Sequence, residues 1–141
     1  MKLKFLSDIN EYGEHAIRLN DFDMAQATMF FQILSELVNK KKNTIELSDF
    51  EFIEADNCSL TLRISETDEG IITDDYKHFF CDLTTEGYIE MLKLIEPFCI
   101  KETDAYRILY ELDNPIEFIF SAGKENWLLG QTISAFDNMC L

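Results

Sequence analysis

The two histidines and their acidic neighbours are the first residues to consider for chemistry. His78 lies in the segment Asp74–Asp82, and an imidazole beside carboxylates can act as a general base or a metal ligand. If residues 78–83 form a strand, however, His78 and Asp82 are about 13 Å apart, at roughly 3.3 Å per residue. Side chains this far apart cannot share a proton or a metal. We therefore interpret His78 as a surface residue near the edge of a sheet.

Metal-binding patterns are absent from the sequence. His15 follows Glu11 and Glu14, but no HExxH or Glu-x-x-His pair accompanies them. The segment 65–76 places a glycine at the sixth position of a calcium loop, yet its twelfth residue is Tyr76, where the pattern requires glutamate. We expect neither a metal nor a cofactor.

The cysteines and glycines do not form catalytic motifs either. No two cysteines stand in a CxxC pair, and the chain has no GxSxG elbow and no glycine-rich phosphate loop. Free cysteines are commonly small buried residues. We expect that role for Cys58, Cys81 and Cys99, and exposure for Cys140 near the C-terminus. The sequence therefore predicts no catalytic residue, although a site built from distant segments stays open.

The charge balance carries more information than the motifs. The chain has 141 residues, 12 of them basic and 27 acidic, with a net charge of −15. Such a balance argues against direct binding of nucleic acid, which needs clustered Lys and Arg. The acids concentrate in two stretches, Glu46–Asp56 and Glu66–Asp75. Either they form a solubility surface, or they form a face that docks on a basic partner.

The second acidic stretch, with a nearby aromatic residue, provides the predicted partner-binding site. Aromatic side chains beside charged ones are typical of the residues that dominate binding energy. Phe50, Phe52, Phe80, Tyr106, Tyr110 and Trp127 are candidates for such exposed aromatics. The residues we expect to bind a partner are Glu66, Asp68, Glu69, Asp74, Asp75 and Phe80.

Targeting signals are not evident. The apolar run at the N-terminus is broken by Lys4 and stops at Leu6, short of the roughly 7–15 residues of a signal peptide. No stretch approaches the ~18 apolar residues of a membrane-spanning helix. We expect a cytoplasmic protein without a membrane partner. The excess of Ile over Val and of Lys over Arg suggests a bacterial source.

Hydrophobic periodicity predicts two main helices. Apolar residues at three- and four-residue steps predict a helix over Met24–Lys41, with Asp23 as N-cap and Gln26 as its capping-box partner. A second helix begins after Thr84 or Thr85, and Pro97 is expected to end it. Gly87 in its first turn should weaken this helix slightly.

The remaining segments alternate or are rich in β-formers, which predicts strands. The segments 106–112 and 116–121 are expected to form a hairpin with Asp113-Asn114-Pro115 as its turn. The expected strands are Lys2–Leu6, Ala16–Leu19, Phe50–Ala55, Ser59–Ser65, Ile71–Thr73, His78–Leu83, Tyr106–Leu112 and Ile116–Ser121.

This order of elements predicts the α+β class. Strands in meander order favour an antiparallel sheet of about five to seven strands, with two helices packed on one face. Residues 1–141 are expected to form a single domain, with 124–141 as an appended tail or a short helix.

Two functions of different classes are consistent with these observations. The first is a non-catalytic interaction domain whose acidic face binds a basic protein, as an immunity-like protein or an inhibitor. The alternative is a small ligand-binding domain or enzyme, with a non-local site near the sheet and the C-terminal tail. Self-association through an apolar sheet face is a third option.

Overall fold

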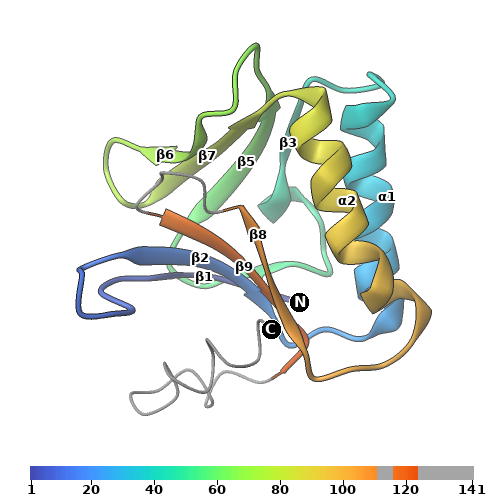
Figure 1. The fold of residues 1–141 in the computed structure, drawn as a ribbon, viewed down its shortest axis with the longest axis horizontal. Helices are drawn as coiled ribbons and strands as arrows, with labels where there is room; N and C mark the ends of the chain where they lie inside the picture. The colour runs from blue at the N-terminus through green and yellow to red at the C-terminus, as the bar shows by residue number, and fades with distance from the viewer. Residues whose placement is uncertain (111–115, 124–141) are drawn as a thin grey trace.

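The chain folds into two mixed β-sheets and a pair of helices, shown in Figure 1. The computed structural model describes residues 1–110 and 116–123. The predicted tail, the predicted turn at 113–115 and the residues Trp127 and Cys140 lie outside the described residues. The expected α+β class is confirmed, whereas the expected single antiparallel sheet is replaced by two sheets of mixed direction.

The five-stranded sheet pairs some strands that are neighbours in the sequence and others that lie far apart in it. Its strand order is β4 (Glu54–Ala55), β1 (Lys2–Leu6), β2 (His15–Asn20), β9 (Ile116–Ser121) and β8 (Tyr106–Tyr110). The pairs β1–β2 and β8–β9 are antiparallel, while β4–β1 and β2–β9 are parallel. The predicted hairpin of β8 and β9 is thus confirmed, and β9 also continues the sheet beside β2. We refer to this sheet as sheet A.

The four-stranded sheet, sheet B, has its longest strands in the middle. Its order is β3 (Thr44–Glu46), β5 (Ser59–Ile64), β7 (His78–Leu83) and β6 (Gly70–Thr73). The central pair β5–β7 is parallel, and both edge strands run antiparallel to their neighbours. Strand β6 is therefore an edge strand with a loop at each end.

The two helices pack side by side and close one side of the space between the sheets (Figure 1). Helix α1 (Met24–Val38) starts at Asp23, whose side chain and that of Gln26 form the predicted capping box. It ends at Val38 rather than Lys41, because Asn39 caps it and Lys40 takes a left-handed backbone conformation (φ 60°).

Helix α2 (Thr85–Ile100) starts after the predicted cap Thr84 but runs through Pro97, so the expectation that Pro97 ends it is wrong. The proline lies in the last turn, so its ring and its missing N–H disturb only the end of the helix. Phe98, directly after it, is buried in the core and favours continuation of the helix.

The expected strand over Phe50–Ala55 is also wrong for most of its length. A short 3-10 helix, η1 (Leu47–Asp49), precedes a turn in which the amide of Ile53 donates to the carbonyl of Phe50 at 3.0 Å. Leu47 and Ile53 are both buried, so this segment folds to place two apolar anchors in the core.

The main core lies between the two sheets and the helix pair. Side chains from the inner faces of both sheets and from both helices belong to the same buried cluster. Phe120 of β9 is at its centre, with ring centroids 4.2 Å from Phe22, 5.6 Å from Phe30 and 4.9 Å from Phe98. Alternation along the strands places a second, smaller buried cluster, Ala16, Tyr106 and Ile119, on the opposite face of sheet A.

Candidate interaction surface

The outer face of sheet B carries a mixed apolar and charged surface. Alternation along β5 and β7 turns Leu60, Leu62, Phe79 and Cys81 into the core, so the residues between them face outward. Strand pairing places Ile72 beside Phe80 and Arg63 beside Asp82. The surface, which we call the sheet B outer face, consists of Thr61, Arg63, Ile72, His78, Phe80 and Asp82.

Arg63 connects the charged and the apolar parts of this face. Its guanidinium makes two parallel bonds to the carboxylate of Asp82, at 2.7 and 2.8 Å. The same guanidinium lies 4.0 Å from the ring centroid of Phe80, a cation–π arrangement. Hydrogen bonding to Asp82 raises the pKa of Arg63. Beside this pair, Ile72 is 40% exposed, which is unusual for an isoleucine in a sheet.

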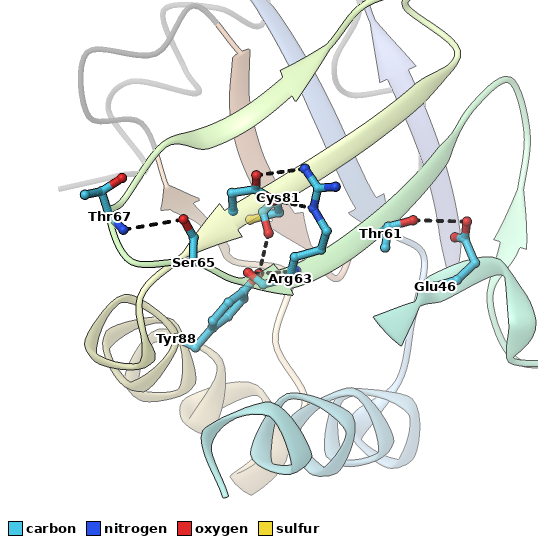
Figure 2. A network of polar contacts seen from close by, with 8 residues as sticks. Glu46, Thr61, Arg63, Ser65, Thr67, Cys81 and Tyr88 are labelled. Carbon is cyan, nitrogen blue, oxygen red and sulfur yellow. Dashed lines mark hydrogen bonds and ion pairs between the residues drawn. The ribbon is translucent and has the colours of Figure 1, made fainter. Parts of the chain in front are cut away.

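Tyr88 of α2 holds the two central strands of sheet B from the core side. As Figure 2 shows, its phenol reaches from α2 to Arg63 and Cys81. The hydroxyl accepts a hydrogen bond from the amide of Arg63 at 3.1 Å and donates to the carbonyl of Cys81. Burial is the main reason that the pKa of Tyr88 is raised. The strand positions that present Arg63 and its neighbours are therefore held by a buried side chain.

The three predicted acids of the β5–β6 loop differ in what they contact. The carboxylate of Asp68 accepts hydrogen bonds from the amide of Thr84 at 2.8 Å and from its hydroxyl at 2.9 Å. Asp68 therefore stabilises the start of α2. Glu69 accepts a hydrogen bond from the hydroxyl of Thr67 within the loop. Glu66 is exposed.

The β6–β7 turn holds the other two predicted acids and one histidine. Asp75 accepts hydrogen bonds from the amides of Lys77 and His78, both at 2.9 Å, and its second oxygen lies 2.7 Å from Nδ1 of His78. The backbone bond from His78 is the main reason that the pKa of Asp75 is lowered. His78 therefore pairs with Asp75, three residues earlier in the sequence. Sequence reasoning tested only Asp82 as its partner and so missed this contact. Asp74 is exposed.

The six predicted residues do not converge on one point. The acids of the two loops lie at opposite ends of β6, whose four residues span about 13 Å. Phe80 lies between them on the sheet B outer face, next to Ile72. Sequence reasoning missed Ile72 and Arg63. The adjacent pair Ile71-Ile72 was the available signal, because neighbouring residues of a strand face opposite sides.

The first acidic stretch divides between the two sheets. Glu46 accepts a hydrogen bond from the hydroxyl of Thr61 at 3.2 Å, beside sheet B (Figure 2). Asp56, in contrast, pairs with Lys4 at the edge of sheet A. Of the aromatic candidates, Tyr106 is buried, whereas Phe50, Phe52, Phe80 and Tyr110 are half-buried. The acids therefore do not form one continuous face.

His15 contacts neighbouring residues of the fold and, in the described part of the chain, no group that suggests catalysis. Its Nδ1 accepts a hydrogen bond from the amide of Asp8 at 3.1 Å, and its ring lies 5.6 Å from Phe5 and 5.8 Å from Tyr76. Glu14 accepts a hydrogen bond from Asn10. Within residues 1–110 and 116–123, no three ligand-type side chains gather as they would around a metal ion.

The three described cysteines are free thiols that burial keeps protonated. Burial raises the pKa of Cys58 to about 11 and that of Cys81 to about 12, and it also raises that of Cys99. A thiolate nucleophile needs the opposite shift. Cys81 is fully buried, as expected, while Cys58 and Cys99 are only partly buried.

Comparison with protein-family models, with curated proteins and with solved structures finds no match for this chain. Among the described residues, neither helix has the length and apolar character needed to cross a membrane.

Proposed function

We propose that this protein is a non-catalytic interaction domain that binds a basic protein through the sheet B outer face. The observation that carries the proposal is the exposed Ile72 beside Phe80, between two acidic loops. Protein interfaces commonly have an apolar centre and a charged rim. Ile72 and Phe80 supply the centre, and the loops at either end of β6 supply the rim.

The rim acids have different roles in this proposal. Asp68 and Asp75 are engaged by hydrogen bonds within the fold, so they orient the loops. Glu66 and Asp74 are exposed and provide the charge that attracts a basic surface. Charges of this kind mainly accelerate association and select partners, while the apolar centre supplies affinity.

The net charge and the free thiols support a basic partner and a cytoplasmic location. A net charge of −15 favours association with a cationic protein. The three cysteines in the described part of the chain are free, which fits the reducing cytoplasm, and the composition fits a bacterial cell. Neutralisation of a basic toxic protein, as by an immunity protein, is the narrower form of the proposal.

The test is an affinity capture from lysate of the source organism, with three bait proteins. These are the unmodified protein, the double variant Glu66→Lys/Asp74→Lys, and the matched double variant Glu11→Lys/Glu96→Lys. All four residues are exposed, and both double variants change the charge equally. We expect one basic protein to bind the unmodified and matched baits, and to be lost from the Glu66/Asp74 variant and at raised salt.

A second variant separates the apolar centre from the rim. Ile72→Ser should weaken capture even at low salt and increase the dissociation rate, because it removes the exposed apolar contact. Equal capture by all four baits would contradict the proposal. Equal loss from both charge-reversed baits would reduce it to nonspecific attraction.

A further inference from the structure

A hollow of about 270 Å³ lies on the outer face of sheet A, over strands β4, β1 and β2. It is on the opposite side of this sheet from the core, and none of its residues belongs to the sheet B outer face. Both signs of charge line it. The side chains that matter are Lys2, Lys4, Arg18, Asn20, Glu54 and Asp56.

The β2 residues of the hollow are buried. Arg18 and Asn20 are each only 1% exposed. Asn20 Nδ2 donates to the carbonyl of Gly123 at 3.3 Å, but its Oδ1 receives no hydrogen bond from the described residues. Ser121, its neighbour across the β2–β9 pair, likewise has a buried hydroxyl without a partner there. Buried polar atoms are nearly always hydrogen-bonded, so a missing donor implies a bound water or ligand.

The β1 and β4 residues of the hollow carry charges close to this orphaned acceptor. Lys2 stands opposite Asn20 on one side and pairs with Glu54 on the other. Its ammonium lies 3.8 Å from Asp21, and that of Lys4 lies 3.5 Å from Asp56. These are long, partly exposed ion pairs, which contribute little to stability and rearrange readily.

We propose that this hollow binds a small zwitterion, namely a free amino acid. The ligand's ammonium group donates to Asn20 Oδ1 on β2. Its carboxylate faces the lysines of β1. A simple anion would meet Glu54 and Asp56, and a simple cation would meet three basic side chains, so a molecule with both charges fits the lining best.

The size of the hollow agrees with this class of ligand. About 270 Å³ holds an amino acid but is below the usual range of roughly 300–1,000 Å³ for larger ligands. Adjacent strands are about 4.8 Å apart, so Lys2 and Asn20 are near enough to contact the two charged groups of one such molecule.

The experiment uses the full chain and each of the twenty amino acids, at up to about 10 mM, where even a millimolar site is mostly filled. Binding is followed by thermal shift and by amide NMR. We expect at least one amino acid to raise the melting temperature by a few degrees. Its NMR shifts should concentrate on β1, β2 and β4. Acetate and ammonium ions, added as separate molecules, should reproduce neither effect.

Two variants and one control test the assignment. Lys2→Gln changes a partly exposed side chain and should lower the affinity about tenfold. Asn20→Ala removes the orphaned acceptor and should lower it as much, provided that the variant remains folded. Lys93→Gln removes the same charge from an exposed lysine that also has one acidic neighbour. It should leave the affinity unchanged.

Three outcomes would overturn the proposal. If no amino acid binds, Asn20 is satisfied by water alone. If acetate shifts the same amides as strongly, the site is an anion site. If Lys2→Gln and Lys93→Gln behave alike, binding occurs elsewhere.

Discussion

The carboxylate of Asp68 occupies the space in which a side chain on Gly87 would begin. A Cβ placed on Gly87 would lie 2.8 Å from Asp68 Oδ1 and 3.1 Å from the Cβ of Leu83. Asp68 cannot move away freely, because the same oxygen accepts two hydrogen bonds from Thr84. The glycine expected to weaken α2 is therefore required for the loop that caps it.

This contact predicts an unusual sign for a helix substitution. Gly to Ala within a helix normally stabilises by up to about 1 kcal/mol. Gly87→Ala should instead lower the free energy of unfolding by about 1 kcal/mol, because it displaces Asp68 from Thr84. Urea unfolding at neutral pH measures this difference. In an Asp68→Ala background the same substitution should be less harmful, and strictly additive effects would contradict the explanation.

The buried phenol of Tyr88 gives a second prediction. Tyr88→Phe leaves the amide of Arg63 and the carbonyl of Cys81 without this partner. Unsatisfied buried groups of this kind cost about 1–3 kcal/mol, so the urea midpoint should fall by a corresponding amount. Tyr12→Phe is the matched control, because Tyr12 is 80% exposed. If the two variants unfold alike, the Tyr88 hydroxyl has no role in holding β5 and β7.

The bidentate pair on the sheet B outer face should also be measurable. A double-mutant cycle with Arg63→Ala and Asp82→Ala should give a coupling energy of about 1 kcal/mol, since the pair is only partly exposed. Arg63→Lys should lose most of this coupling, because an ammonium cannot make two parallel bonds or lie flat on Phe80. Coupling near zero would mean that the pair does not organise the face.

Local features could be predicted from the sequence, whereas the arrangement of the strands could not. The capping box of Asp23 and Gln26 and the alternation of β5 and β7 depend on neighbouring residues. The parallel pairing of β2 with β9 joins segments about a hundred residues apart, and no local pattern specifies it. Local patterns alone are consistent with a simple meander, which is why the sequence predicts one sheet where the structure has two.

The candidate sites show the same limit. The sequence predicts that Phe80 binds a partner, but only the structure shows that Ile72 and Arg63 lie beside it. Asp68 looked like a surface acid, because its partner Thr84 is sixteen residues away. The hollow on sheet A combines residues from three strands, so no local sequence motif predicts it.

The thiols provide a chemical prediction. With Cys140 replaced by serine, Cys58 and Cys81 should react with a disulfide reagent at pH 7.5 at least about a hundred times more slowly than a free thiol, and Cys99 should also react more slowly than a free thiol. The reason is that burial raises the pKa of Cys58 to about 11 and of Cys81 to about 12. All three should react rapidly in urea. Fast labelling of any one in the native protein would contradict this prediction.

The hydrogen-bonded pair of Asp75 and His78 in the β6–β7 turn predicts the direction of one pH effect. The pKa of Asp75 is lowered from 3.8, mainly by the backbone hydrogen bond from His78 and then by its ring. A carboxyl group whose pKa is lower in the folded state stabilises the fold above its unfolded pKa. That contribution is lost as the pH falls through the lower, folded value.

The variant Asp75→Asn should therefore be less stable than the unmodified protein at pH 6, and the gap should shrink as the pH falls below about 4. Urea unfolding at a series of pH values gives both curves. Asp74→Asn serves as the control for removing one negative charge from the same turn. A gap that stays constant down to pH 2 would show that Asp75 acts through its shape and not through its charge.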